Sequence, residues 1–506
     1  MKYIFKILFC AVTLTCLCYA QDLNIIPKPV SGSSINEKFI IQNGGDIFIS
    51  KGNAGLKKVA EYLKTAINKR TGIKLNIKKG VSNKGIVLEL NRKLSVENNG
   101  YELTINSNIV KVIGKDCTGI FYGIQTLRQL LKKDKNFYVS GCKIKDYPQY
   151  AHRGFMLDAS RHFQSVEFVK QVLDVMALLK LNVFHWHLTD DQGWRIESKK
   201  YPKLNEIGSF MDSLNSVERN GYYTVEEIKS VIKYAKDRFI KIIPEVEMPG
   251  HSQAVMESYP ELLCPTNKSG NTYCAGNAKS YEFIKKVLEE VIDIFETDVI
   301  QLGGDERPKG IWKNDPQDIE MMTRKNIDNE DLLQNYFMKD ISDYISGKGI
   351  QTIAWAENLQ GGVPKSQYVE NYYPDVSVQS ARSGYYTINA NCFYTYFDYP
   401  NSDEEKKNKP DWMPVLNLER VYSFNPTPDS LEQDAKKYII GTECALWTEV
   451  VFQKDIQFQL FPRILAFSEA AWSPKDRKDY KNFVERVKTI KPYINSIGFE
   501  FTKGGW

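Results

Sequence analysis

Residues 299–306 read Val-Ile-Gln-Leu-Gly-Gly-Asp-Glu, a short apolar run that leads into two glycines and two adjacent carboxylates. An apolar run of this length that ends at glycines is typical of a buried strand. Glycines allow the backbone to bend sharply or to lie close to a ligand. Parallel α/β folds keep their chemistry just past the carboxyl ends of such strands, so this stretch predicts a site at Asp305 and Glu306.

Strand and helix patterns alternate on both sides of this stretch. Eight strands are expected from residue 153 onward, at 153–158, 181–188, 240–248, 299–306, 350–357, 376–382, 392–398 and 439–449. Helical spacing is clearest between them at 165–180, 224–238, 279–297, 331–347 and 456–471. This alternation predicts a parallel sheet, and eight strands fit a (β/α)8 TIM barrel. An open doubly wound sheet is the competing architecture, but no Gly-x-Gly-x-x-Gly turn supports it.

The residues before the barrel have a different pattern. Residues 21–146 contain several short strand-like runs and two helical stretches, at 55–70 and 118–132. They predict a small α+β domain with an antiparallel sheet. The barrel, with a further amphipathic helix near 478–495, is expected to occupy residues 147–506.

Residues 1–20 read as a signal peptide. Lys2 and Lys6 bracket a short basic region, and an apolar run follows at residues 7–17. Cys18-Tyr19-Ala20 is a small-x-small cleavage site. We therefore expect export, to the periplasm or as a secreted protein, with a lipid anchor as the weaker alternative. No other stretch reaches the ~20 apolar residues of a membrane span.

Composition limits the partners and the covalent cross-links. A net charge of +5 in 506 residues is too mild to indicate nucleic acid or an anionic membrane as partner. Of nine cysteines, six follow the predicted signal peptide. Cys264 and Cys274 flank a polar loop that a disulfide would close in an oxidising compartment, whereas the other four are expected to be small buried side chains.

The carboxyl ends of the predicted strands carry the side chains that recognise sugars. Carboxylates accept hydrogen bonds from hydroxyl groups, and indole rings stack on the C–H faces of sugar rings. Nearly all of the eight strand ends carry acidic, aromatic or basic side chains. These are Asp158, Arg161, Asp190, Asp191, Glu247, His251, Asp305, Glu306, Trp355, Glu357, Arg382, Tyr396, Asp398, Trp447 and Glu449. Stability alone does not explain this set, which therefore favours a carbohydrate ligand.

These residues lie in stretches that resemble one known family. Gly303-Gly304-Asp305-Glu306 looks like the signature of the family 20 glycoside hydrolases, the β-N-acetylhexosaminidases. Further stretches match the same family in the same order, at residues 152–162, 181–191, 249–251, 355–357, 396–398 and 446–449. The resemblance covers about residues 147–475, and the N-terminal domain is similar to the family's usual companion domain.

The resemblance implies a role for each of the two adjacent carboxylates. Family 20 is an exception among retaining glycosidases, because the substrate's own acetamide serves as the nucleophile. By this resemblance Glu306 is the general acid and later the base, while Asp305 orients the acetamide and offsets the charge of an oxazolinium intermediate. A general acid working near neutral pH needs a raised pKa, so we expect one for Glu306. Neither a cofactor nor a metal is expected.

The resemblance also implies how the sugar is bound. Tyr396 completes the catalytic set by hydrogen bonding to the acetamide oxygen. The expected substrate-binding residues are Arg153 and Glu449 on the ring hydroxyls, Trp355 and Trp447 as walls, Asp398 beside Tyr396, and Asp190 with His251 beside the acid. An arginine at the blind end would make the enzyme exo-acting on N-acetylhexosamine-containing glycans with terminal β-linked GlcNAc or GalNAc.

One stretch departs from the family pattern. The family usually has a tryptophan at the end of the sixth strand, and the matching stretch here, residues 378–383, places Ala381 there. Two explanations stay open: Tyr385 or Tyr386 takes the place of the tryptophan, or the alignment slips at this strand. This leaves open a disaccharide-releasing enzyme similar to the lacto-N-biosidases. A non-catalytic carbohydrate-binding barrel is a further alternative, against which the intact Asp305 and Glu306 argue.

Two groups of residues also have structural interpretations. His185 and His187 share one face of a strand, where they either ligate a metal or, as we favour, form hydrogen bonds in the barrel core. Asp158 and Arg161 are interpreted as a structural ion pair under the pocket.

Overall fold

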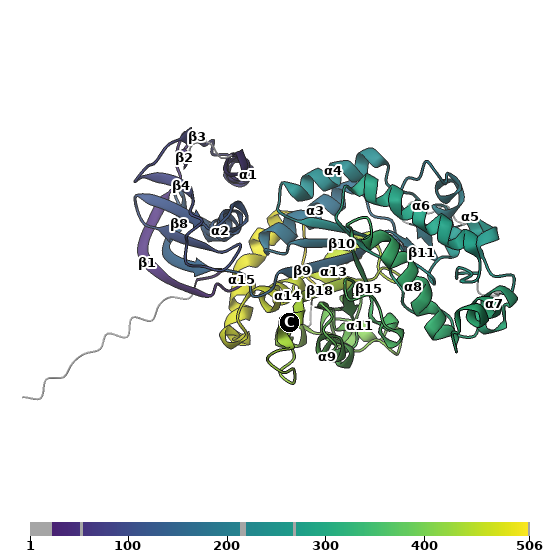
Figure 1. The fold of residues 1–506 in the computed structure, drawn as a ribbon. Coiled ribbons are helices and arrows are strands. Elements are labelled where there is room, and N and C mark those ends of the chain that lie inside the picture. The colour runs from purple at the N-terminus through teal and green to yellow at the C-terminus, as the bar shows by residue number, and fades with distance from the viewer. Residues whose placement is uncertain (1–22, 51–53, 213–218, 267–269, 504–506) are drawn as a thin grey trace, which may run out of the picture.

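The protein consists of two adjoining units, a sheet domain and a barrel (Figure 1), in a computed structural model that describes residues 23–50, 54–212, 219–266 and 270–503. The predicted signal peptide lies outside the described residues. Within the described ranges, no helix combines the length and the apolar character needed to cross a bilayer.

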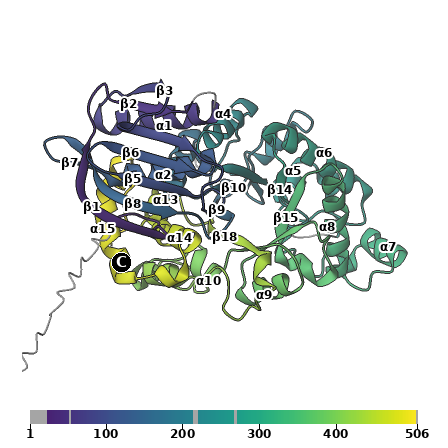
Figure 2. The same cartoon turned by 60° about the vertical axis from the view of Figure 1, so that its left-hand side comes forward.

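The N-terminal unit is a sheet with two helices packed against it (Figure 2). The strand order is β1-β8-β5-β6-β4-β2-β3, with β7 paired to β8. The elements are β1 (Ser31–Ile40), β2 (Asp46–Ile49), α1 (Ala54–Thr71), β3 (Asn76–Lys79), β4 (Gly85–Leu90), β5 (Tyr101–Ile105), β6 (Ile109–Gly114), α2 (Cys117–Leu130), β7 (Leu131–Lys133) and β8 (Phe137–Asp146). The sheet is mixed rather than antiparallel throughout, because β6, β4, β2 and β3 run parallel to one another.

The two helices of this unit form where the sequence predicts them. In α1 the buried side chains Leu56, Val59, Leu63 and Ile67 recur at three- and four-residue intervals along one face. The α2 helix begins at Asp116, whose carboxylate accepts a hydrogen bond from the backbone N–H of Gly119, and it is buried along most of its length. A helix buried on several faces needs partners on each, and α2 packs both on the sheet and against α3 of the barrel.

The second unit is a closed barrel of eight parallel strands, which confirms the predicted TIM barrel. Its strands are buried along nearly their whole length, as expected where helices cover the outside of a parallel sheet. In chain order they are β9 (His152–Asp158), β10 (Val183–His187), β13 (Lys241–Glu245), β14 (Val299–Gln301), β15 (Gln351–Trp355), β16 (Tyr368–Asn371), β17 (Thr387–Asn389) and β18 (Ile439–Leu446).

Helices form the outer layer of the barrel (Figure 1). A capping box opens α4, where Thr224 and Glu227 each bond to the other's backbone N–H. The main helices are α3 (Val166–Leu178), α4 (Val225–Lys236), α6 (Ala278–Phe295), α8 (Glu330–Ser346), α13 (Gln453–Leu460), α14 (Arg463–Trp472) and α15 (Tyr480–Ser496). Further helices lie in the loops: α5 (Gln253–Ser258), α7 (Pro316–Lys325), α11 (Asp403–Lys406) and α12 (Leu418–Ser423).

Two of the predicted strands are wrong. Residues 376–382 belong to helix α9 (Pro374–Arg382), and residues 392–398 begin with the short helix α10 (Cys392–Thr395). Pro374 occupies the first turn of α9, where its missing N–H costs nothing. The sixth and seventh strands are instead β16 and β17, which are only four and three residues long and therefore show little periodicity.

Candidate active site

A cavity of about 430 Å³ opens at the carboxyl ends of the barrel strands. This is the end at which barrels of this kind place their ligands. Its lining residues come from the carboxyl ends of seven of the eight strands or from the loops that follow them: Arg161, His251, Asp305, Glu306, Trp355, Tyr372, Tyr373, Cys392, Phe393, Tyr396, Asp398, Tyr399, Trp412, Trp447 and Glu449. Most of the predicted site residues therefore lie together around one pocket.

The two glycines turn the chain so that the carboxylate pair meets the pocket. Gly303 and Gly304 have φ values of +63° and +98°, a region that favours glycine. A Cβ atom on Gly303 would also lie 1.8 Å from Glu247 Oε2, so no other residue fits there. Glu306 itself has φ of +44°, and its backbone N–H is held by Glu357 Oε2 at 2.9 Å. The local backbone is therefore specialised for presenting Asp305 and Glu306.

Asp305 and Glu306 occupy different environments although they are adjacent. Asp305 is 9% exposed and its Oδ1 has no hydrogen-bond partner among the described residues, whereas the Glu306 side chain is 67% exposed. Burial, reinforced by the nearby carboxylates of Glu245 and Glu357, raises the pKa of Asp305 to about 7. An unpaired buried acceptor is available to a ligand N–H group.

The prediction that the pKa of Glu306 is raised is wrong. The contact with His251, whose Nε2 lies 3.6 Å from Glu306 Oε2, lowers the pKa of Glu306, and partial burial opposes this only in part. The physical reason is that Glu306 faces water and a cation, whereas a raised pKa needs the removal of water or a neighbouring negative charge.

A chain of polar contacts leads from Glu306 to the floor of the pocket. His251 Nδ1 lies 3.2 Å from Asp190 Oδ1, and the other oxygen of Asp190 lies 2.8 Å from Arg161 Nη2. Burial opposes ionisation of Asp190, but Arg161 and His251 keep its pKa well below the usual range. Asp190 in turn raises the pKa of His251 despite its burial, so His251 is held as a cation beside Glu306. The predicted pairing of Asp190 with His251 near the acid is present.

Arg161 occupies the place at the pocket floor that was expected of Arg153. Its guanidinium lies 3.3 Å from Asp158 Oδ2 and 3.5 Å from Glu449 Oε1, and 5.0 Å from the Trp447 ring. Its buried Nε has no hydrogen-bond partner within the described part of the chain. The predicted ion pair with Asp158 is real, yet Arg161 also lines the pocket and presents donors to it.

The prediction that Arg153 binds ring hydroxyls is wrong. Arg153 is the second residue of β9, at the end of the strand opposite the pocket, and it is fully buried. Its guanidinium donates to the carbonyl oxygens of Lys180 and Tyr150 and to the hydroxyl of Tyr122 on α2. Because Tyr122 belongs to the N-terminal unit, Arg153 joins the two units instead of binding a ligand.

Aromatic rings form the walls of the pocket. The Trp447 ring centroid lies 6.2 Å from that of Trp355 and 6.1 Å from that of Tyr396. Trp355 is fixed from behind, because its Nε1 donates to Glu245 Oε1 at 2.8 Å. These three predicted residues therefore surround a space suited to a flat, partly apolar ring. Asp398 lies beside them, 2% exposed, and burial raises the pKa of Asp398 to about 8.

The misplacement of the sixth strand hid two pocket residues. Tyr372 and Tyr373 directly follow β16 and line the cavity, and the Tyr372 hydroxyl donates to Glu357. Ala381 lies in α9 and is fully buried, so it is not the residue at the end of the sixth strand. Tyr368-Val-Glu-Asn shows no alternation of apolar and polar residues, so no periodicity in the sequence located these tyrosines. Trp412, 68% exposed at the cavity, had no signal in the sequence.

Histidines and carboxylates fill the barrel interior below the pocket. His185 contacts Glu443 at 2.6 Å and Glu245 at 2.9 Å, and His187 Nε2 lies 3.1 Å from Asp190. Carboxylates thus contact both histidines, as the preferred interpretation expects, and the metal alternative stays open because His185, Glu370 and Glu443 also lie close enough to hold one ion. His187 stacks edge-on against Trp447 at 5.1 Å, so this network supports the floor of the pocket.

Comparison with known proteins places this architecture in a family. A barrel preceded by a companion sheet domain, with two adjacent carboxylates in its pocket, is the arrangement of a class of glycoside hydrolases. The family described as "Glycosyl hydrolase family 20, catalytic domain" matches residues 150–475, and "Glycosyl hydrolase family 20, domain 2" matches residues 22–147. The chain belongs to glycosyl hydrolase family 20.

Relatives and solved structures agree with this assignment. The chain is 35% identical to a β-hexosaminidase of Porphyromonas gingivalis over 96% of this chain and 65% of that protein. It is 34% identical to a β-hexosaminidase of Vibrio furnissii over 71% of this chain and 62% of that protein. The chain thus spans just under two thirds of the length of these two relatives. A solved GH20 exo-β-N-acetylglucosaminidase from Vibrio harveyi, in complex with N-acetylglucosamine, is similar with a TM-score of 0.89 and 29% identity over 96% of this chain and 79% of that chain.

Proposed function

We propose that this protein is an exo-acting, retaining β-N-acetylhexosaminidase that releases terminal β-linked GlcNAc or GalNAc from glycans. The observation that carries the proposal is the adjacency of Asp305 and Glu306 in one aromatic pocket, one carboxylate buried and the other facing solvent. Two neighbouring carboxylates lie on the same side of a bound sugar, so neither is suited to attack from the opposite face as in ordinary retaining glycosidases. The nucleophile is then the substrate's acetamide oxygen.

In this mechanism Glu306 handles the protons. Its carboxyl group donates a proton to the leaving oxygen and later removes one from water. A sugar in the pocket displaces the water around Glu306, which raises the pKa of the carboxyl group toward the range a general acid needs. The His251 cation, 3.6 Å from Glu306, limits this increase in pKa and stabilises the Glu306 carboxylate after it has given up its proton.

Asp305 and Tyr396 position the acetamide. Asp305 accepts the acetamide N–H with its unpartnered Oδ1, which turns the carbonyl oxygen toward the anomeric carbon. Tyr396 donates to that oxygen from the facing wall, and Trp355 and Trp447 pack against the ring and the methyl group. An intramolecular nucleophile held in this way has a large effective molarity. Oxazolinium formation places positive charge beside the Asp305 carboxylate, which offsets it.

The proposal includes exo action. Arg161, held by Asp158, Asp190 and Glu449, forms a charged floor that suits the hydroxyls of a terminal sugar. Tyr372 follows the sixth strand, so the apparent absence of an aromatic residue there no longer favours a disaccharide-releasing enzyme. The non-catalytic alternative has no observation in its favour.

Substitution of the pair tests the proposal. Glu306→Gln and Asp305→Asn should each lower kcat for an aryl β-N-acetylglucosaminide by about 10²- to 10⁴-fold, the usual contribution of a positioned acid or base. Glu404→Gln removes an exposed carboxylate and should leave kcat unchanged. Near-normal turnover by Glu306→Gln would overturn the assignment, and the absence of any chromophore release by the unaltered protein would favour the non-catalytic barrel.

We also propose that the protein is exported to the periplasm or secreted. Support comes from the basic, apolar and small-residue pattern of residues 1–20, which lie outside the described residues. Amino-terminal sequencing of protein recovered outside the cytoplasm tests this, and retention of residues 1–20 on cytoplasmic protein would contradict it.

A further inference from the structure

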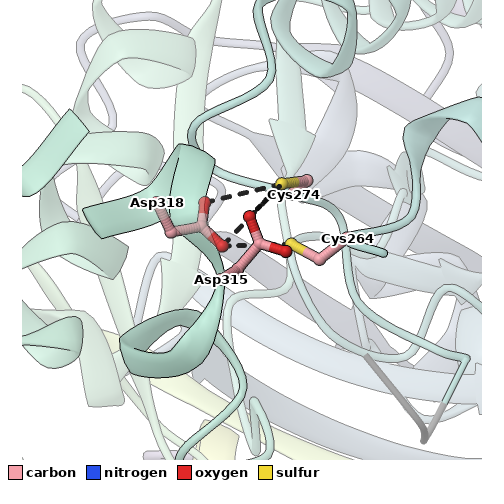
Figure 3. A group of neighbouring side chains, drawn as sticks. All are labelled: Cys264, Cys274, Asp315 and Asp318. Carbon is pink, nitrogen blue, oxygen red and sulfur yellow. Dashed lines mark hydrogen bonds between the residues drawn. The ribbon is translucent and has the colours of Figure 1, made fainter. Parts of the chain in front are cut away.

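Four metal-ligand side chains meet in the loops beyond the pocket (Figure 3). Cys264 and Cys274 come from the long loop between β13 and α6, and Asp315 and Asp318 lie at the start of α7, after β14. One ligand atom of each residue lies within 4.8 Å of those of the other three, and all four side chains are fully buried. None of these residues takes part in the proposed hydrolysis.

The distances within this Cys2Asp2 cluster fit a tetrahedral ion. Cys264 Sγ lies 3.0 Å from Asp318 Oδ2, Cys274 Sγ lies 3.6 Å from Asp318 Oδ1, and Cys274 Sγ lies 3.9 Å from Asp315 Oδ1. Two ligands on a tetrahedral zinc ion, with bonds of about 2.0–2.3 Å, are separated by roughly 3.5 Å. The observed separations bracket this value, so an ion fits between the four groups with small side-chain adjustments.

Among the residues that the structure describes, no cation compensates the charge of the cluster. Neither Asp315 nor Asp318 forms an ion pair with a described lysine, arginine or histidine. The polar groups that do reach them are neutral: Thr266 Oγ1 and the backbone N–H of Gln317 donate to Asp315, and the backbone N–H of Gly276 and the thiols of Cys264 and Cys274 donate to Asp318. Burying two carboxylates together is costly unless they are paired or bind a metal.

The backbone holds the four ligands in place without the ion. An antiparallel bridge between Leu263 and Tyr273 sets the two cysteines side by side. Asp315 is the N-cap of α7, and Asp318 follows three residues later on the same face of the helix. Gly276 packs so closely against the start of α7 that a Cβ atom there would lie 2.2 Å from the carbonyl oxygen of Gln317. The site is thus preorganised from two separate loops.

We propose that Cys264, Cys274, Asp315 and Asp318 bind one structural zinc ion. Thiolates select zinc over magnesium and calcium, which take oxygen ligands only. Four protein ligands close the coordination sphere and leave no open position for catalysis. This proposal departs from the sequence-based expectation of no metal, and it replaces the Cys264–Cys274 disulfide that the sequence leaves open; in the structure both residues are free thiols.

The ion would stabilise the loops that carry the catalytic residues. His251 lies in the same loop as the two cysteines, and Glu306 precedes the two aspartates. Trp312 couples the loops near the cluster, because its Nε1 donates to the carbonyl oxygen of Tyr273 at 3.0 Å, and the guanidinium of Arg307, next to Glu306, stacks on its ring at 4.5 Å. A bound ion at this junction fixes the positions of the loops that carry His251 and Glu306, and it does so without contacting the substrate.

Elemental analysis of the purified full chain tests the proposal directly. We expect about one zinc ion per chain, retained through dialysis and released by a strong chelator, as in closed four-ligand sites. The Cys264→Ser/Cys274→Ser and Asp318→Asn variants should lose the zinc. Cys142→Ser, which removes a buried thiol from the N-terminal unit, is the matched control and should keep it. Zinc content equal in the double variant and the unaltered protein would overturn the proposal.

Two further measurements on the unaltered protein keep the test valid if a variant fails to fold. Chelation should lower Tm, and added zinc should restore it. After a chelator is added, thiol titration under denaturing conditions without reductant should detect all of the cysteines as free thiols. If the count is two thiols short and only a reductant restores them, a disulfide is present and the zinc site is refuted. The zinc site is also refuted if protein from zinc-supplemented cells contains no zinc and fails to bind added Zn²⁺.

Discussion

The proposal that Arg161, and not Arg153, binds the sugar leads to opposite expectations for two matched variants. Lysine at either position keeps the positive charge but lacks the planar fork of the guanidinium. In Arg161→Lys, the removal of each hydrogen bond between the charged group and a sugar hydroxyl costs about 1.5–3 kcal/mol. Since 1.4 kcal/mol is a factor of ten, kcat/KM should fall by roughly 10- to 150-fold for each hydrogen bond that the lysine fails to make.

Arg153→Lys should affect stability and leave turnover intact. Arg153 donates three short hydrogen bonds, at 2.9 Å to Lys180 O, 2.6 Å to Tyr150 O and 2.8 Å to the Tyr122 hydroxyl. A lysine preserves one of them, and each of the others, donated by a charged group, is worth about 1.5–3 kcal/mol. The free energy of unfolding should therefore fall by about 3–6 kcal/mol, with kcat/KM per folded molecule unchanged.

The assay pairs initial rates on an aryl β-N-acetylglucosaminide with thermal unfolding of the same preparations. The expected pattern is a large decrease of kcat/KM in Arg161→Lys and a lowered Tm with normal kcat/KM in Arg153→Lys. The reverse pattern, with Arg153→Lys inactive at an unchanged Tm and Arg161→Lys active, would refute the placement of the two arginines.

Two more predictions concern the acetamide and a buried carboxyl group. An aryl β-glucoside lacks the acetamide nucleophile, so it should be cleaved at least about 10³-fold more slowly than the aryl β-N-acetylglucosaminide; comparable rates would indicate a protein nucleophile instead. Burial raises the pKa of Asp398 to about 8, so the folded protein binds this proton more tightly than the unfolded chain, and the stability it contributes is full below about pH 4 and is lost as pH rises through about 8. Tm should therefore fall less between pH 5 and about pH 8 in Asp398→Asn than in the unaltered protein, and parallel curves would contradict this.

The sequence predicts the barrel well where strands are long and apolar. Stretches such as 181–188 and 439–449 carry enough β-branched and aromatic residues to be recognised without tertiary information. The strands β16 and β17 are too short for this, and the aromatic run at 392–398 resembles a strand although Asn391 caps a helical turn there. Tyr396 and Asp398 still reach the pocket, because the loop after β17 runs back along β18, where Tyr396 pairs with Ala445.

The sequence predicts the site residues by the rule that chemistry lies at strand ends. That rule identifies Asp305, Glu306, Asp190, His251 and Trp447, all of which meet in one region. Arg153 entered through family resemblance and breaks the rule, since it stands near the amino end of β9. The rule alone favours Arg161, three residues past the carboxyl end of that strand.

By itself, the sequence determined the fold class, the family and the identity of the two central carboxylates, because hydrophobic periodicity and glycine-bounded motifs are local properties. The tertiary structure decided which charges meet. Only folding brings Asp190 against both His251 and Arg161, and only folding buries Asp305 while Glu306 stays exposed to solvent. Folding also assembles two cysteines and two aspartates from separate loops. The physical reason is that pKa values and ligand sets depend on distance and burial, which residues far apart in the chain acquire only when the barrel closes.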